Sequence, residues 1–182
     1  MKNVMENEFD ILNRRMEKNH EMRRTYLMFA FTTSIAAIAA LFIVDFSNVV
    51  SWGCIVPFAI IIPFQARISY ARLSHAKMEA YICVFYPKKF KFLKRQVSDL
   101  RGKIGKFISI IVNYELFLLS VVINLLYIII NSKIELCILV FKLESIIIII
   151  ATLIVFSLAT YSFPYVKFLE KYMNEYKILR KG

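Results

Sequence analysis

The chain has 182 residues, of which 59% are hydrophobic, and its mean hydropathy is +0.59. A soluble core of this size does not require so many apolar residues, so the composition excludes an ordinary soluble domain and favours a membrane protein. The 24 Lys and Arg residues outnumber the 13 Asp and Glu residues. In a membrane protein such an excess is typical of cytoplasmic loops, so the charge alone does not indicate nucleic-acid binding.

Residues 1–25 are predicted to form a cytoplasmic amphipathic helix. One apolar face follows from spacings of four, three and four between Met5, Phe9, Leu12 and Met16. Such a helix either lies on the membrane surface or packs against another helix, and the pattern is consistent with both arrangements. Residues 1–24 mix acidic and basic side chains and contain no small-residue cleavage site, so we do not expect a cleavable signal peptide.

Residues 26–64 are predicted to form a first transmembrane hairpin. Residues 26–44 are free of charge over a length close to the roughly 20 residues that cross the hydrocarbon. Small residues recur at every fourth position, which favours close helix packing within the chain or between subunits. This stripe consists of Thr32, Ala36 and Ala40. In the second arm, Pro57 and Pro63 predict a kink or a break that serves as a hinge.

Residues 65–106 are predicted to be the main basic cytoplasmic segment. Residues 66–86 lack Gly and Pro, which favours a helix that ends before Pro87. A basic amphipathic helix is expected next, whose cations bind anionic lipid headgroups or a protein partner. These cations are Lys88, Lys89, Lys91, Lys94 and Arg95. Direct nucleic-acid binding is disfavoured, because Phe90 and Phe92 are more simply explained as interfacial anchors.

Residues 107–163 are predicted to form a second transmembrane hairpin with arms at 107–131 and 145–163. Three polar residues in its first arm are candidates for a polar membrane path or pore lining: Asn113, Glu115 and Asn124. An ionisable residue inside a span normally marks function. Two other interpretations remain open. Glu115 is interfacial if the hydrocarbon begins later in the arm, and the Asn side chains instead form hydrogen bonds between helices.

Residues 164–182 are predicted to be a basic cytoplasmic tail. Together, the N-terminal tail, the middle segment and this tail hold 22 of the 24 Lys and Arg residues. The positive-inside rule therefore places both termini in the cytoplasm and the protein in the inner (cytoplasmic) membrane as a multi-pass protein. The predicted fold is all-α, an integral membrane protein with four transmembrane helices in two hairpins plus cytoplasmic amphipathic helices.

No motif predicts catalysis, a metal site or a cofactor. Three Cys and two His form no zinc or redox pattern, and four Gly residues form no phosphate loop. The pair Arg15 and His20 resembles the short Arg-His pattern of the HEPN ribonuclease superfamily, which implies a membrane-tethered ribonuclease as one alternative. Such a pair also arises by chance in a basic chain.

The order of amphipathic helix, tight membrane hairpin and basic cytoplasmic helix resembles the SLATT-type membrane effectors of bacterial antiphage systems. The resemblance covers residues 9–24, the hairpin 26–64 and the helix that bears Arg67, Arg72, Tyr81 and Phe85. The second hairpin departs from the two-helix form. The resemblance implies a small effector that oligomerises and permeabilises the inner membrane when a cytoplasmic sensor signals.

The first functional hypothesis is therefore an oligomeric membrane-perturbing or pore-forming effector in antiphage defence. Its expected partners are the anionic bilayer, further copies of the chain and a cytoplasmic sensor or effector protein. The alternative from a different class is a non-conducting accessory or immunity-type protein that binds a cytoplasmic partner.

Overall fold

The computed structural model describes residues 2–43, 52–87, 103–131, 142–162 and 164–181. Side chains are not described for residues 2–7, 41–43, 103–113 and 181 within these ranges. The described residues form five helices: α1 (Lys2–Ile43), α3 (Val56–Phe85), α5 (Lys103–Ile130), α7 (Leu143–Ser162) and α8 (Tyr165–Lys181). No strand occurs among them, and the prediction of an all-α fold is confirmed.

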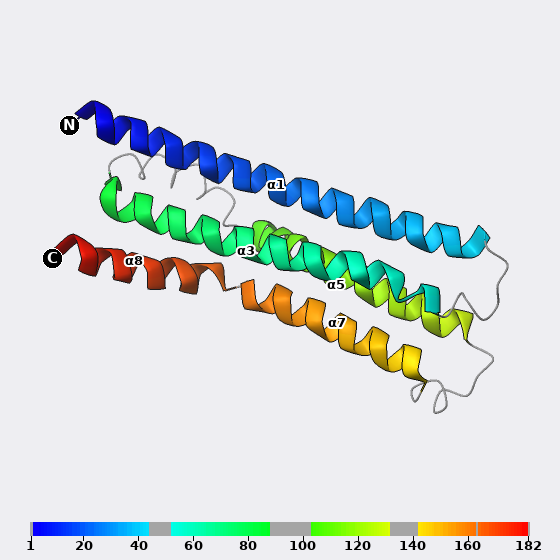
Figure 1. Cartoon of the computed structure of the whole chain (residues 1–182). Coiled ribbons are helices and arrows are strands. Elements are labelled where there is room, and N and C mark those ends of the chain that lie inside the picture. Colours follow the sequence, from blue (N-terminus) through cyan, green and yellow to red (C-terminus); the bar gives the residue numbers. More distant parts are fainter. Residues whose placement is uncertain (1, 44–51, 88–102, 132–141, 163, 182) are drawn as a thin grey trace.

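The helices form one elongated bundle in which both chain ends lie at the same end (Figure 1). α3 runs antiparallel to α1, since Glu8 of α1 contacts Tyr86 of α3 while Tyr26 contacts Phe64. α7 and α8 follow one another alongside α3, which lies at the centre of the bundle (Figure 1). This up-and-down arrangement is typical of helix bundles with antiparallel neighbours.

α1 is a single helix of 42 residues that joins the predicted amphipathic helix to the predicted first span. No Gly or Pro lies between Lys2 and Ile43, so nothing in the sequence interrupts the helix. At 1.5 Å per residue it is about 63 Å long, roughly twice the thickness of the hydrocarbon core. The separate N-terminal element that was predicted over residues 1–25 is therefore the first part of a longer helix.

α3 continues through Pro63 without interruption, so the predicted break in the second arm does not occur. Pro57 lies in the first turn, where its missing N–H costs no helical hydrogen bond. Phe58 and Ile61 lie between the two prolines and are buried in the core, and their burial helps to offset the bond lost at Pro63. The helix ends at Phe85, ahead of Pro87, as the sequence predicted to within one residue.

The predicted basic tail is the helix α8, which packs along α3. Pro164 separates it from α7, as expected for a residue that cannot continue a helix. Tyr165 Oη donates a hydrogen bond to Glu79. Arg180 Nη1 donates one to the carbonyl oxygen of Val84 at 2.7 Å. These bonds fix both ends of α8 against α3.

Two clusters of buried side chains stabilise the bundle. The smaller one, near the termini, places Met16 against Ile82 and Tyr86, with Phe9 and Leu12 beside them. The apolar face of residues 1–25 thus packs on α3, which is one of the two arrangements left open by its sequence. The larger cluster fills the other half with side chains from α1, α3, α5 and α7.

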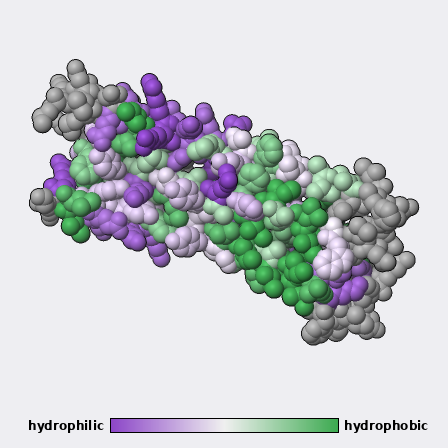
Figure 2. All heavy atoms as spheres, in the orientation of Figure 1, coloured by the Kyte–Doolittle hydropathy of each residue, from purple (hydrophilic) through white to green (hydrophobic). Residues whose placement is uncertain are grey.

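The face of the bundle shown in Figure 2 divides into two halves along the bundle axis. Hydrophilic residues predominate in the half near the termini, the polar half, and hydrophobic residues predominate in the other half, the apolar half (Figure 2). Within the described residues, Leu143–Ser162 is a helix long and apolar enough to cross a membrane, and Tyr114–Ile130 is a shorter apolar helix. The first of these lies where the sequence predicted the fourth span.

Candidate functional site

A small cavity of about 50 Å³ lies between α1, α3 and α8, where the polar and apolar halves meet. Its polar lining consists of Asn19, His20, Arg23, Arg72, His75 and Tyr165. The volume is several times the roughly 10–15 Å³ that one water molecule needs. Among the residues that the structure describes, no Asp or Glu belongs to this lining.

Helical spacing and the break at Pro164 bring these residues together. Asn19 and Arg23 are four residues apart on α1, while Arg72 and His75 are three apart on α3, so each pair shares a helix face. Asn19 Nδ2 donates a 3.4 Å hydrogen bond to Ser74 Oγ, which joins the two helices at this level. Tyr165 follows the proline break, and its ring lies 6.2 Å from that of His75 between centroids.

Arg72 is the most unusual member of the lining. Only 7% of this residue is exposed, and its Nε has no hydrogen-bond partner among the described residues. Burial, followed by the nearby charge of Arg23, lowers the pKa of Arg72 to about 10. The guanidinium therefore stays positively charged at neutral pH. A buried cation that lacks a full set of partners is costly, so an anion in the cavity would stabilise it.

The pKa values of two other cavity residues, Arg23 and His75, are also shifted by their surroundings. Burial lowers the pKa of Arg23, whereas the nearby carboxylate of Glu115 on α5 raises it. Burial lowers the pKa of His75, with further lowering from His20 and Arg23, so His75 is neutral at pH 7. Two acidic groups interact with residues of this lining: Glu115 with Arg23, and Glu79 with Tyr165. Neither lines the cavity.

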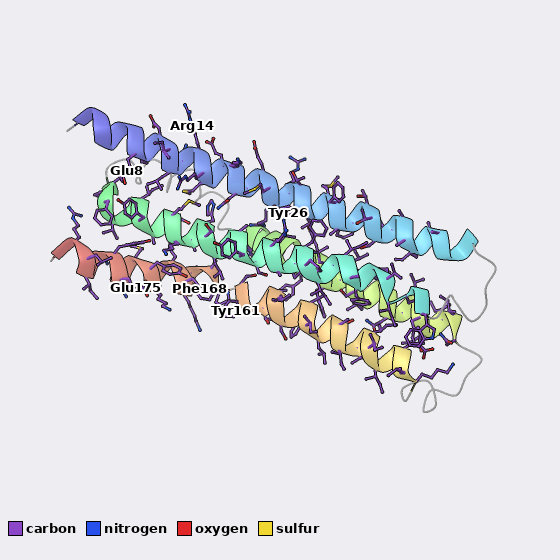
Figure 3. All side chains as sticks on the ribbon, viewed as in Figure 1. Glu8, Arg14, Tyr26, Tyr161, Phe168 and Glu175 are labelled. Atoms are coloured by element: carbon purple, nitrogen blue, oxygen red, sulfur yellow. The ribbon has the colours of Figure 1, made fainter. Side chains whose placement is uncertain are left out.

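Four tyrosines on four helices form a tyrosine belt near the cavity: Tyr26, Tyr70, Tyr114 and Tyr161. Three of them lie within four residues of a cavity residue in the sequence, namely Arg23, Arg72 and Tyr165, and Tyr114 affects the pKa of Arg72. Tyr26 packs on Phe64 at 5.7 Å between ring centroids and lies below the Arg67 guanidinium. Tyr161 and Phe168 pack across the proline break (Figure 3). Tyrosine is enriched where helices leave the hydrocarbon. This belt was missed in the sequence, although each of its tyrosines lies near one end of an apolar run.

The polar residues predicted for the third span lie at different depths. Glu115 is half-buried near Arg23, at the junction of the two halves. Asn124 donates hydrogen bonds to Thr152 Oγ1 of α7 at 2.6 Å and to the Ser120 carbonyl at 2.9 Å. Nine residues of helix separate Glu115 and Asn124 by about 13 Å. The Asn113 side chain lies outside the described residues.

The small-residue stripe faces away from the rest of the chain. Thr32, Ala36 and Ala40 are exposed, and the Thr32 hydroxyl donates to its own helix at Met28. The buried small residues of α1 are instead Ala30 and Ser34. The predicted close packing at the stripe therefore does not occur against any other helix that the structure describes. The cations predicted to bind lipid headgroups or a protein partner lie outside the described residues: Lys88, Lys89, Lys91, Lys94 and Arg95.

The two residues of the HEPN-like pair are not brought together. Arg15 and His20 are five residues apart on α1, which separates them by about 140° around the helix. His20 lines the cavity, whereas Arg15 is exposed and does not. The described residues also contain no group of three or more His, Cys, Asp or Glu side chains that could hold a metal ion.

The fold and site of the described residues define a class: a helical bundle in which one described helix is long and apolar enough to cross a membrane, with a basic cavity at the edge of its apolar half. Comparisons with protein-family models, curated proteins and solved structures give no match to this chain.

Proposed function

We propose that the chain is a multi-pass protein of the cytoplasmic membrane, with its apolar half in the bilayer and both termini in the cytoplasm. The observation that carries the proposal is that α5 and α7 are apolar on their outer as well as their inner faces. The exposed side chains include Leu118, Val122, Leu125, Ile129, Ile146, Ile150, Leu153 and Ile154. Soluble proteins rarely expose so large a contiguous apolar surface, because water would favour its burial.

Four spans in two hairpins are consistent with the arrangement of the helices. α1 and α3 run alongside α5 and α7 through the apolar half, and residues 26–43 of α1 reach about 27 Å. The tyrosine belt would then lie at the cytoplasmic interface, with α8 and the first half of α1 in the cytoplasm. The excess of Lys and Arg in the termini supports the same orientation.

For activity, we propose an oligomeric effector that perturbs the membrane, as the resemblance to SLATT-type effectors implies. The interior of the apolar half is filled by packed side chains such as Phe58, Leu116 and Ile123. Any permeation path would therefore run between chains. The exposed stripe at Thr32, Ala36 and Ala40 is available for such an assembly, since no other part of the described chain covers it.

A second candidate is a non-conducting accessory protein that binds a cytoplasmic partner. The hydrogen bond between Asn124 and Thr152 favours it, because this bond uses a polar residue inside the apolar half for packing rather than for a path. In this case the polar half, rather than the apolar half, would carry the specific interaction.

Liposomes loaded with a self-quenched dye distinguish the two candidates. Wild type is compared with the variant Ala36→Leu/Ala40→Leu and with Ala59→Leu, a control that enlarges an exposed small residue elsewhere in the apolar half. The effector proposal expects leakage from wild type and the control but little from the double variant. If folded wild type causes no leakage even after a cytoplasmic extract is added to supply a partner, the result would favour the accessory protein. Equal leakage from all three proteins would contradict assembly through the stripe.

A further inference from the structure

We infer that the cavity between α1, α3 and α8 is a binding site for a phosphate group, held by Arg72 and Arg23. This inference goes beyond the proposed membrane activity, because it concerns a ligand and a site that leakage does not require. The phosphate group belongs either to a soluble molecule or to a lipid headgroup, and only the second case rests on the proposed placement in the bilayer.

The first argument is the state of Arg72. The residue is more than nine-tenths buried and lines the cavity, and its buried Nε has no hydrogen-bond partner among the described residues. Buried polar groups in native proteins are nearly always paired, so a buried guanidinium without a full set of partners requires an explanation such as a ligand. A phosphate in the cavity would accept hydrogen bonds from the guanidinium of Arg72 and would also neutralise its charge.

The second argument is the composition of the lining. Two arginines approach one cavity from different helices, although their like charges repel, as the effect of Arg23 on the pKa of Arg72 shows. Asn19, His20 and His75 add side chains that can donate hydrogen bonds. Planar guanidinium groups match the geometry of phosphate oxygens and are typical of phosphate recognition.

The nearby acids do not replace such a ligand. Glu115 lies near Arg23, and its charge opposes the lowering of the Arg23 pKa by burial. Glu79 accepts the hydrogen bond from Tyr165. Neither carboxylate lines the cavity, and burial and the charge of Arg23 lower the pKa of Arg72. Within the part of the chain that the structure describes, no carboxylate of the lining therefore balances the charge of Arg72.

The cavity is accessible to a phosphate from two sources. Exposed His20 connects it to the surface, so phosphate or a phosphate ester in solution can enter. The cavity also lies at the level of the tyrosine belt, where phospholipid headgroups would be found if the apolar half is in the bilayer. Both sources present the same tetrahedral anion, and the measurement below distinguishes them.

The test uses the delipidated full chain in neutral detergent and follows its thermal unfolding. One arm titrates inorganic phosphate against chloride at matched ionic strength. The other compares micelles that contain phosphatidylglycerol with micelles that contain phosphatidylcholine. The variants are Arg72→Gln, Arg23→Gln and the control Arg67→Gln, which removes an exposed arginine from α3 outside the cavity.

The site predicts a saturable stabilisation of wild type and of Arg67→Gln. The apparent affinity should be about tenfold or more weaker in the two cavity variants, since each loses a charge-assisted hydrogen bond. A response to inorganic phosphate identifies the soluble source, and a response to phosphatidylglycerol alone identifies the lipid. If Arg72→Gln does not fold, Arg23→Gln decides the result. The inference is overturned if wild type shows no saturable response in either arm, or if Arg67→Gln is weakened as much as the cavity variants. Neither result depends on dye leakage, so failure of this inference is distinguishable from failure of the proposed membrane activity.

Discussion

Asn124 of α5 donates a 2.6 Å hydrogen bond to the hydroxyl of Thr152 on α7, inside the apolar half of the bundle. The Thr152 hydroxyl in turn donates to the Ile148 carbonyl at 2.9 Å. Because the two residues are 28 positions apart, this bond fixes the register of α5 against α7. A hydrogen bond between helices in lipid adds only modestly to the free energy of unfolding, but it requires a defined geometry between the two helices.

Thr152→Val should therefore destabilise the bundle by about 0.6 kcal/mol and at most about 1.7 kcal/mol, the range measured for such bonds. The change keeps the shape of the side chain and removes only its hydroxyl. Unfolding in detergent by increasing SDS measures the effect. Thr160→Val is the matched control, since the Thr160 hydroxyl donates to its own helix at Phe156 and Ser157. Equal losses in both variants would show that the interhelical bond contributes nothing.

Two alanines of α1 should respond oppositely to enlargement. Ala30 is fully buried, so Ala30→Leu should destabilise the single chain by about 1–3 kcal/mol through overpacking. Ala36 is exposed, so Ala36→Leu should change the stability of the single chain by less than about 0.5 kcal/mol. Thermal unfolding in dilute detergent checks both values.

Ala36→Leu should nevertheless reduce cross-linking between chains in liposomes, because the larger side chain keeps helix backbones apart. Unchanged cross-linking would mean that the stripe faces lipid only. This pair of substitutions thus separates packing within the chain from packing between chains.

The contact between the start of α1 and the end of α3 should weaken in acid. Hydrogen bonds from Tyr86 at 2.6 Å and Tyr81 at 3.0 Å lower the pKa of Glu8 below its ordinary value of 4.5. A lowered pKa means that the stabilisation is present above pH 4.5 and is lost as the pH falls through the folded value. Glu8 and the polar half that surrounds it are shown in Figure 3.

Hydrogen exchange of the first turns of α1 measures this loss as the pH is lowered from 6 to about 3. Protection should fall more steeply in wild type than in Glu8→Gln, whose amide does not titrate. A control variant, Glu17→Gln, changes a carboxylate that accepts a hydrogen bond from Asn13 of the same helix and should behave like wild type. An identical pH profile for wild type and Glu8→Gln would contradict the prediction.

Cysteine labelling should confirm the proposed orientation. In a background with all three cysteines changed to Ser, Lys177→Cys on exposed α8 should react with an impermeant maleimide only after the cells are opened. Trp52→Cys, at the opposite end of the bundle, should react in intact cells. Labelling of Lys177→Cys in intact cells would reverse the orientation, and the positive-inside argument would then be wrong.

The sequence by itself determined that the fold is all-α and located the helix ends that prolines mark, because hydropathy, proline positions and helical periodicity are local properties. Pro87 and Pro164 mark helix ends in both the sequence and the structure. The unbroken passage of α3 through Pro63 was not predictable, since packing around the proline decides whether a helix survives it.

Only the tertiary structure decided which faces meet. The stripe at Thr32, Ala36 and Ala40 points outward because Ala30 and Ser34 occupy the inner face of α1. Arg23, Arg72 and Tyr165 are far apart in the sequence, and each resembles an ordinary interfacial residue when considered alone. They form one cavity because the register between α1 and α3 and the break at Pro164 place them at the same level. That register depends on side-chain packing across the whole bundle, which no local pattern contains.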